Sequence, residues 1–359
     1  MTPLEAEIRK IIAVDGPMPV AQFMALALGH PAHGYYTTRD PLGADFITAP
    51  EISQMFGELI GLWAAAVWQQ MEKPRRVLQV ELGPGRGTLM ADTLRAAKIM
   101  KDFRVALAVH LVETSPALQR RQEQALKDCG VPVFWHRDLA QVPQCDPLIV
   151  VANEFFDALP VHQAVRAKSG WHERMVGVGD DGKLTLALAP DPIPGFSAGL
   201  PPKLRDAPVG AVYEWRSDAF GHELAAGLVR QSGAALIVDY GHEGGIGETL
   251  QGVAQQTFAS ALERPGEVDL SAHVDFSALA RAAEKAGARA HGPVPQAELL
   301  RRLGIEARAA RLKAAAPARA GEIDAALARL TEGGPRGMGE LFKALALADP
   351  KLGALPGFG

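Results

Sequence analysis

Residues 75–89 have the sequence Arg75-Arg76-Val77-Leu78-Gln79-Val80-Glu81-Leu82-Gly83-Pro84-Gly85-Arg86-Gly87-Thr88-Leu89, and the rest of the chain is organised around them. The apolar run 77–82 predicts a buried strand, and three glycines spaced two apart follow it. Apolar residues at helical spacing come next. A strand, a glycine turn and a helix present backbone N–H groups to a ligand at a strand's carboxyl end. We therefore expect Gly83, Gly85 and Gly87 to form a ligand-binding turn.

Further apolar runs predict a sheet around this turn. They lie at residues 105–113, 131–135, 146–152 and 234–239, and helical patterns at 116–126 and 217–231 fall between them. Near-continuous Val, Ile and Leu in such runs is typical of a parallel sheet covered by helices on both faces. The expected fold class is α/β, with a doubly wound, Rossmann-like sheet.

Three additions surround this core. Residues 1–74 carry helical periodicity and predict an N-terminal helical extension and lid. Residues 75–243 hold the core, interrupted at about 161–216 by alternating segments that predict an antiparallel insertion. Residues 244–359 predict a helical cap and the C-terminal part of the core; within them, 338–346 fits either a helix or the last strand.

Composition limits the kinds of partner. The net charge of −4 gives no sequence-wide reason to expect nucleic acid, because phosphate binding usually needs a basic surface, although it leaves room for a local basic patch. Two cysteines without a CxxC pair suit a reducing compartment and argue against structural zinc. The apolar run 59–68 is too short to span a bilayer. We expect a cytoplasmic protein without membrane insertion; the sequence does not give the oligomeric state, and a homo-oligomer is compatible with it.

The spacing of the glycines differs from that of a dinucleotide-binding turn. A dinucleotide turn, G-x-G-x-x-G, would place its third glycine at position 88, where Thr88 stands. Glu113 ends the second strand, where an acid can hold both ribose hydroxyls, and Asp138 follows the third. This E-x-G-x-G-x-G pattern with its two later acids resembles class I S-adenosylmethionine-dependent methyltransferases, in which the acid after the third strand reads the adenine amino group.

A resemblance to one family extends over nearly the whole chain. It is carried by HPAHGYY at 30–36, FITAPEISQMFGE at 46–58, ELGPGRGTL at 81–89, LVETSP at 111–116, NEFFDALPV at 153–161, PGEVDLSAHVDFSALA at 265–280 and MGELFK at 338–343. These stretches resemble the MidA family, bacterial relatives of a mitochondrial complex I assembly factor described as a protein arginine methyltransferase. The resemblance implies a class I methyltransferase core that binds S-adenosyl-L-methionine, and symmetric dimethylation of an arginine on a respiratory complex subunit. The cofactor residues that it implies are Glu81, Gly83, Gly85, Gly87, Glu113, Thr114, Asp138, Leu139 and Asn153.

The segment after the fourth strand supplies candidates for the acceptor side. A guanidinium nucleophile needs its planar donor fork oriented and its charge held, which carboxylates do. Glu154 is the first candidate for this clamp and Asp157 the second, while Phe155 and Phe156 could wall the pocket. Equally, the two phenylalanines could be core residues and Asp157 a helix cap.

Glu51 is the third candidate for the clamp, on a presumed lid over the glycine turn. With Thr48 it also has the spacing of a capping box at the start of a helix that runs to about Met71, which Thr48 or a nearby polar residue could cap, and both interpretations remain open. Asp239, after the fifth core strand, is a further acid that such a crevice could reach. His273 and His242 are weaker candidates, as proton acceptors.

Asp269, His273 and Asp275 have a spacing that occurs in metal sites. Methyl transfer needs no metal, and we expect helix capping by Asp269 or Ser271 rather than ligation. Two other functions fit the same core: a small-molecule methyltransferase, and a methyltransferase-fold assembly protein whose main task is to hold a respiratory subunit.

Overall fold

The computed structural model describes residues 1–38, 48–254, 257–334 and 337–359. Contacts divide the chain into two compact units. The first comprises Met1–Phe46, Asp157–Ser217 and Gly244–His273, and the second comprises Ile47–Phe156, Asp218–Glu243 and Val274–Gly359. This division differs from the consecutive segments drawn from the sequence, because the predicted insertion packs with the N-terminal helices.

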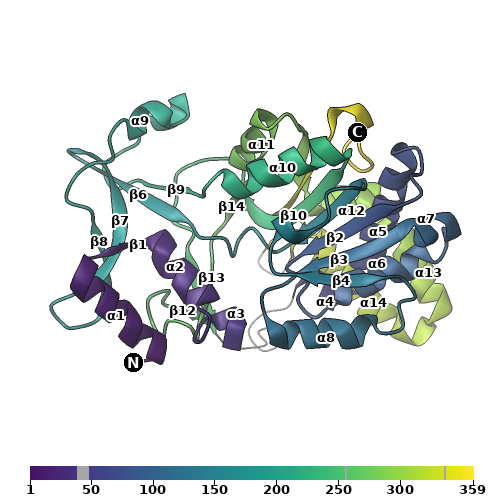
Figure 1. Ribbon diagram of the computed structural model, residues 1–359, viewed down its shortest axis with the longest axis horizontal. Helices are drawn as coiled ribbons and strands as arrows, with labels where there is room; N and C mark the ends of the chain where they lie inside the picture. The colour runs from purple at the N-terminus through teal and green to yellow at the C-terminus, as the bar shows by residue number, and fades with distance from the viewer. Residues whose placement is uncertain (39–47, 255–256, 335–336) are drawn as a thin grey trace. The chain divides into compact units, whose positions relative to one another are not determined.

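The second unit contains the predicted doubly wound sheet (Figure 1). Its strand order is β15-β16-β10-β5-β2-β3-β4, and β14 also pairs with β10. The strands are β2 (Val77–Leu82), β3 (Leu107–Val112), β4 (Val133–His136), β5 (Leu148–Asn153), β10 (Ala234–His242), β14 (Val274–Asp275), β15 (Arg289–Pro295) and β16 (Phe342–Ala348). Strands β4, β3, β2, β5 and β10 are parallel, whereas β16 and β15 are antiparallel additions. The predicted α/β class is confirmed.

Helices cover both faces of this sheet. Helix α5 (Gln54–Gln70) packs with α6 (Thr88–Ala97) on one face, and its Phe56, Leu59 and Trp63 join the main core with alternate residues of β2, β3 and β5. Helices α10 (Ala219–Gln231) and α11 (Phe276–Lys285) contact β16 and cover the other face. Strands β2, β3 and β5 are therefore buried along their whole length, which explains their uninterrupted apolar runs.

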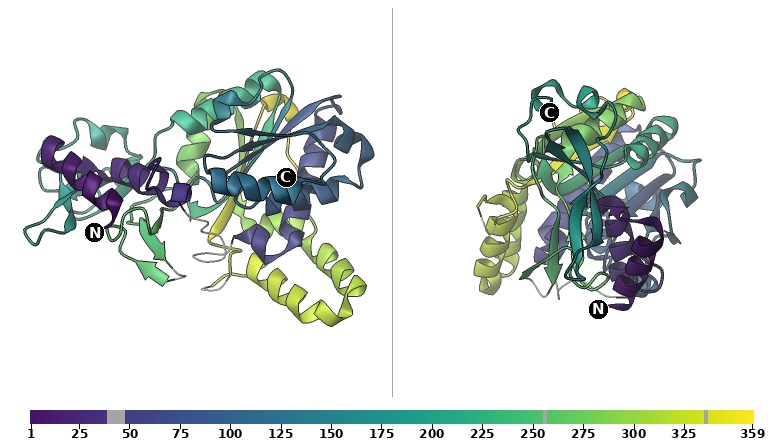
Figure 2. Two further views of the ribbon diagram at one scale, coloured as in Figure 1. Left: turned by 60° about the horizontal axis from the view of Figure 1, so that its bottom comes forward. Right: turned by 90° about the vertical axis from the view of Figure 1, so that its left-hand side faces the viewer.

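The remaining helices of the second unit are shorter or lie toward the C-terminus. Helices α13 and α14 pack against each other in the yellow-green part of Figure 2. The bounds are α4 (Ala49–Ile52), α7 (Lys101–Ala106), α8 (Pro116–Leu126), α12 (Gln296–Arg302), α13 (Ile305–Ala315) and α14 (Ala320–Thr331). Residues 342–348 form strand β16, which decides between the two structures predicted there. None of the helices in the described ranges is long and apolar enough to cross a membrane.

The first unit has its own core and sheets. Helices α1 (Pro3–Asp15) and α2 (Val20–Gly29) bury Ile8, Phe23 and Met24 against β7 and β13. The predicted antiparallel insertion is present as β6, β7, β8 and β9. The bounds are β1 (Met18–Pro19), α3 (Tyr35–Thr38), β6 (His162–Ala167), β7 (Gly170–Val178), β8 (Leu184–Leu188), α9 (Phe196–Gly199), β9 (Val212–Trp215), β11 (Gln251–Ala254), β12 (Thr257–Ala259) and β13 (Asp269–Ser271).

Candidate functional site

The glycine turn follows β2 at the point where the strand order reverses. Strands β3 and β4 continue the sheet on one side of β2, and β5 and β10 continue it on the other. In open α/β sheets, ligands bind at the carboxyl ends of the strands at such a point. The ends of β2, β3, β4 and β5 and the segments that follow them carry the predicted cofactor-binding residues, so the topology brings these residues to one edge of the sheet.

The three glycines of the turn all have left-handed backbones. Their φ angles are +61° at Gly83, +54° at Gly85 and +83° at Gly87, values that disfavour residues with a Cβ atom. A Cβ atom on Gly83 would also lie 3.0 Å from Cδ2 of Phe155. The glycine at position 83 therefore brings the turn backbone close to the ring of Phe155, in the segment after β5. Gly87 directly precedes α6.

Two buried acceptors lie at the ends of the central strands. Oε2 of Glu81 and Oδ1 of Asn153 are inaccessible and have no hydrogen-bond partner within the described ranges. Burial raises the pKa of the Glu81 carboxyl well above its ordinary value. Buried acceptors without donors are uncommon in proteins. A ligand that brings donors, such as the ammonium group of an amino acid, fits these positions.

Glu113 is fixed by donors from its own loop and from α8. Its Oε1 accepts a hydrogen bond of 2.7 Å from the Ser115 N–H, and its Oε2 accepts one of 3.0 Å from Nε2 of Gln122. Burial raises the pKa of Glu113, while the N–H groups of Ser115 and Thr114 and the Gln122 amide lower it. These three donors leave the carboxylate with capacity for a further donor, such as a ribose hydroxyl.

Gln122 is a residue of this site that the sequence reasoning missed. It occupies a buried position of α8 among several polar residues, and its pattern alone reads as an ordinary helix. What distinguishes Gln122 is its complete burial in an amphipathic helix. Burial is known only from the fold, so the sequence alone could not identify this residue.

Asp138 and Leu139 lie just after β4. Oδ1 of Asp138 accepts a hydrogen bond of 2.7 Å from the Ala140 N–H, which caps a short 3₁₀ turn at Leu139–Gln141. The Asp138 side chain is exposed and Leu139 is half-buried. The assignment of these two residues to the adenine end of the cofactor stays a prediction.

Glu154 has an unusual backbone directly after β5. Its φ is +51°, in the left-handed region that residues with a side chain seldom adopt. Oε1 of its carboxylate accepts hydrogen bonds from Asn153 Nδ2 at 3.0 Å and from the Ala49 N–H at 3.1 Å. Such backbones persist where the surroundings enforce them, often at functional sites. Phe155 follows, in an aromatic cluster with Phe156 and Phe220.

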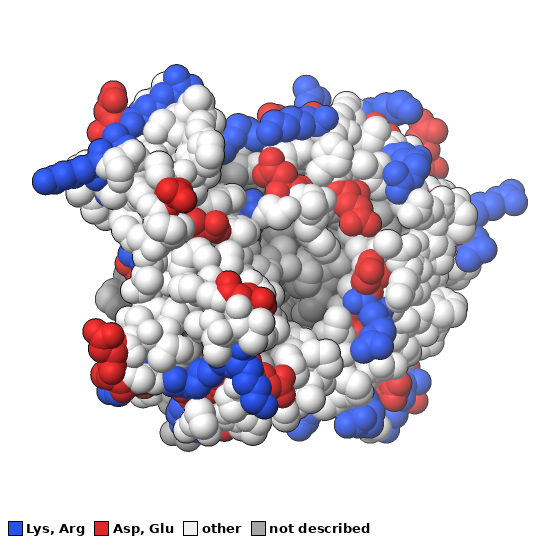
Figure 3. All heavy atoms as spheres, turned by 60° about the vertical axis from the view of Figure 1, so that its left-hand side comes forward, with Lys and Arg blue, Asp and Glu red and all other residues white. Residues whose placement is uncertain are grey.

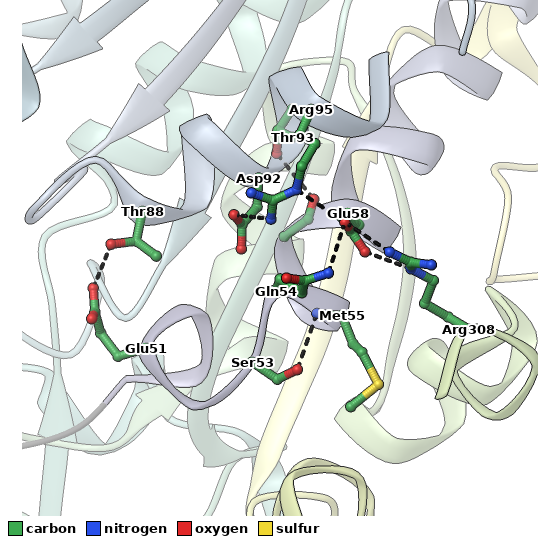
Figure 4. Close-up of polar contacts among 11 residues, drawn as sticks. Glu51, Ser53, Gln54, Met55, Glu58, Thr88, Asp92, Thr93, Arg95 and Arg308 are labelled. Atoms are coloured by element: carbon green, nitrogen blue, oxygen red, sulfur yellow. Dashed lines mark hydrogen bonds and ion pairs between the residues drawn. The ribbon is translucent and has the colours of Figure 1, made fainter. Parts of the chain in front are cut away.

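Glu51 contacts the glycine turn rather than the start of its own helix. Its Oε1 accepts a hydrogen bond of 2.6 Å from the Thr88 hydroxyl (Figure 4). Thr48 precedes α4, but its side chain makes no capping hydrogen bond within the described ranges, and Ser53 instead caps α5 through the Met55 N–H at 3.2 Å. The predicted capping box is therefore wrong. Residues 45–47 of the presumed lid lie outside the described residues.

Asp157 belongs to the first unit, unlike Glu154. It is buried, and its backbone carbonyl accepts hydrogen bonds from the Ala272 N–H at 3.1 Å and from Nη2 of Arg216 at 3.2 Å. Burial, followed by the nearby Asp269 and Asp157 carboxylates, raises the pKa of Tyr36 well above its ordinary value. A role for Asp157 in the clamp stays a prediction.

The Asp239 carboxylate accepts hydrogen bonds from backbone N–H groups. Its Oδ2 accepts a hydrogen bond of 3.0 Å from the Phe156 N–H and its Oδ1 one of 2.9 Å from the Tyr240 N–H. The side chain is completely buried. Asp239 thus anchors the segment after β5 that carries Glu154.

The sequence Asp269–Asp275 is divided between the two units. Asp275 caps α11 through the Ala278 N–H at 3.0 Å, so the expected capping by Asp269 or Ser271 is wrong. Asp269 instead accepts a hydrogen bond of 3.0 Å from the Tyr36 hydroxyl. In the part of the chain that the structure describes, no group of three His, Cys, Asp or Glu residues is placed to hold a metal ion.

Charges of both signs are interspersed over a largely uncharged surface on the face drawn in Figure 3. A phosphate-binding surface typically carries a one-sided basic stripe. The expectation that the partner is not nucleic acid stays a prediction.

Comparisons with known proteins agree with the geometry of the second unit. Residues 59–294 match the family described as S-adenosyl-L-methionine-dependent methyltransferase. A structure from Burkholderia thailandensis bound to S-adenosyl-homocysteine is 29% identical, with a TM-score of 0.85 over 99% of this chain and 94% of that chain.

Named relatives are similar over most of the sequence. The protein arginine methyltransferase NDUFAF7, mitochondrial, of Danio rerio is 37% identical over 83% of this chain and 76% of its own length. The human protein of the same name is 36% identical over 86% of this chain and 75% of its own length. The chain belongs to this family of S-adenosyl-L-methionine-dependent methyltransferases, and S-adenosyl-L-methionine is its cofactor.

Proposed function

We propose that the chain is a protein arginine N-methyltransferase that acts on a subunit of a complex I type respiratory assembly and supports its assembly. The relatives' printed name, protein arginine methyltransferase, supports an arginine acceptor. The resemblance to the family of the complex I assembly factor supports a respiratory complex I type subunit as the acceptor protein. A cytoplasmic location is part of the same proposal.

The observation that carries the proposal is the position of Glu154. Its carboxylate is held by Asn153 and by the N–H of Ala49, immediately beside the ring that packs on Gly83. A carboxylate next to the cofactor turn suits a cationic acceptor, because it accepts hydrogen bonds from a guanidinium and balances its charge. The same carboxylate would disfavour an anionic acceptor.

The residues of the second unit divide into a cofactor side and an acceptor side. Glu81 and Asn153 bind the amino-acid part of the cofactor, Gly83, Gly85 and Gly87 admit it close to the backbone, and Glu113 with Thr114 binds the ribose. Asp138 and Leu139 bind the adenine. When bound, adenosylmethionine supplies a methyl group on a sulfonium.

On the acceptor side, Glu154 orients the guanidinium so that one nitrogen faces the methyl group, and Phe155 stacks on its plane. The bound cofactor would supply the methyl group to the guanidinium and leave as a neutral thioether, and the methylated guanidinium would release a proton to solvent. Alignment and charge balance are what the protein supplies in such a displacement.

The acceptor is tested with a lysate from cells that lack the protein. The purified protein is incubated with this lysate and methyl-labelled adenosylmethionine, and the labelled residue is located by mass spectrometry. We expect label on an arginine of a respiratory subunit. Label on lipid, RNA or a small molecule would overturn the arginine proposal, and respiratory assembly restored by a transfer-deficient variant would favour the assembly-protein alternative.

A further inference from the structure

We infer that Gln122 is a positioning residue, which holds the glycine turn and Glu113 in the arrangement that receives the adenosine part of the cofactor. The inference rests on the proposed role of Glu113 at the ribose. Gln122 lies on α8, outside the glycine motif and the acidic strand ends.

Gln122 connects three segments through one amide group. Its Nε2 donates to the Gly85 carbonyl at 2.8 Å and to Oε2 of Glu113 at 3.0 Å, and its Oε1 accepts from Nε1 of Trp135 at 2.9 Å. Both amide hydrogens are therefore used. The side chain is completely buried, so water cannot replace these partners without a rearrangement.

The first consequence concerns the orientation of the turn. In a planar trans peptide, the N–H of Arg86 points opposite to the Gly85 carbonyl that it follows. Because Gln122 holds that carbonyl, the Arg86 N–H is directed away from α8. The turn also packs closely on the helix, since a Cβ atom on Gly87 would lie 3.3 Å from Cα of Gln122. Gln122 thus selects one of the orientations that the flexible glycines allow.

The second consequence concerns the charge of Glu113. Burial raises the pKa of this carboxyl, and the Gln122 amide is one of the three donors that lower it, with the N–H groups of Ser115 and Thr114. An ionised carboxylate has its full capacity to accept hydrogen bonds from the ribose, whereas a protonated one has lost part of that capacity. Without Gln122, protonation of Glu113 would begin at a higher pH.

The test measures cofactor binding in the full chain. The variant is Gln122→Met, which keeps the length of the side chain and removes the amide. The matched control is Gln124→Met, an exposed position of the same helix. The dissociation constant of S-adenosylhomocysteine is measured by calorimetry at several pH values between 5 and 8.

We expect Gln122→Met to bind about 10- to 100-fold more weakly at pH 8, the loss associated with hydrogen bonds to a charged group. We also expect the pH at which binding weakens on acidification to move upward. Gln124→Met should match the wild type. Unchanged affinity, or weaker affinity with an unshifted pH profile, would overturn the inference.

Two further variants keep the inference testable if Gln122→Met fails to fold, and separate it from the proposed role of Glu113. Trp135→Phe keeps an aromatic ring and removes the donor to Gln122 together with part of the indole. It should shift affinity and pH profile in the same direction by less, and no shift in this variant would count against the inference even if Gln122→Met fails to fold. Glu113→Gln separates the two claims. If Glu113→Gln binds S-adenosylhomocysteine like the wild type, the proposed role of Glu113 is wrong. If Glu113→Gln binds weakly but Gln122→Met binds normally, only the inference about Gln122 is wrong.

Discussion

The Thr88 hydroxyl donates a hydrogen bond of 2.6 Å to Oε1 of Glu51, which joins the first residue of α6 to the short helix α4 (Figure 4). The first residue of α4, Ala49, donates its N–H to Glu154 at 3.1 Å. Helix α4 therefore touches both the cofactor turn and the proposed acceptor carboxylate. This contact predicts a positioning role for Glu51, through Thr88, in addition to its predicted place in the clamp.

The Thr88–Glu51 bond is tested by a double-mutant cycle. Thr88→Val and Glu51→Met, which each remove one partner of the bond, should each weaken adenosylmethionine binding, and together they should cost less than the sum, with a coupling of about 1–2 kcal/mol. Calorimetry measures the four affinities. Thr185→Val, at an exposed threonine of β8, is the control. Strictly additive losses would show that the bond does not act in binding.

Glu58 should contribute strongly to stability. Its buried carboxylate accepts hydrogen bonds from Nε of Arg308 at 2.6 Å and from Nε of Arg95 at 3.1 Å, which ties α5 to α13 and α6 (Figure 4). Glu58→Ala should lower the free energy of unfolding by about 2 kcal/mol or more, because it removes the acceptor of the Arg308 guanidinium and leaves Arg95 with its bond to Asp92.

The comparison is Glu298→Ala, whose ion pair with Arg302 is exposed and should be worth less than about 1 kcal/mol. Urea unfolding of both variants measures the difference. Equal losses would mean that the Glu58 network adds nothing beyond a surface pair.

His110 should make stability depend on pH. Its Nδ1 lies 2.8 Å from Nε2 of His136, and burial, with the nearby His136 and Arg76, lowers the pKa of His110 to about 4. Between pH 6.5 and 4 the unfolded chain therefore binds a proton at this residue that the folded chain does not. The free energy of unfolding falls as the pH falls through this range.

His110→Gln removes the titrating group, so its stability should fall less steeply between pH 6.5 and 4. Urea unfolding at a series of pH values measures the slope, and His222→Gln, at an exposed histidine, is the control. An unaltered slope in His110→Gln would assign the acid sensitivity to other groups.

Gly83→Ala separates backbone strain from the contact with Phe155. Gly83 and Gly182 both have left-handed backbones, at φ +61° and +74°, but a Cβ atom on Gly182 would meet nothing within 4 Å. Each substitution should cost about 1 kcal/mol of stability through the backbone. Only Gly83→Ala should also weaken adenosylmethionine binding, measured by calorimetry; equal affinity in the two variants would contradict the packing role of Phe155.

The sequence predicted those parts of the fold that are determined by residues close together in the chain. The strand, glycines and helix at 77–97 are contiguous, and the acid Glu113 follows directly on a short apolar run that forms the buried strand β3. Residues 342–348 were ambiguous because an antiparallel strand buried on both faces has the same apolar run as a buried helix.

Long-range contacts account for what the sequence could not give. Gln122 reaches Gly85 across 37 positions, and Glu51 reaches Thr88 across the same number, so neither contact has a periodic signature. The capping-box spacing at Thr48 is real, but the Thr88 hydroxyl is a partner for Glu51 that only tertiary structure supplies. In the same way, Asp157 lies three positions after Glu154 and yet belongs to the other compact unit.

The central claim is that Glu154 acts on the acceptor and not on the cofactor, and one paired measurement tests it most directly. Glu154→Gln and the control Glu123→Gln, at an exposed residue of α8, are compared with the wild type for binding of S-adenosylhomocysteine and for transfer of labelled methyl to protein. We predict that Glu154→Gln binds the cofactor product within about twofold of the wild type and loses transfer by about 100-fold, as removal of a preorganised charge contact typically does. Normal transfer by Glu154→Gln, or a loss of transfer matched by an equal loss of binding, would contradict the account.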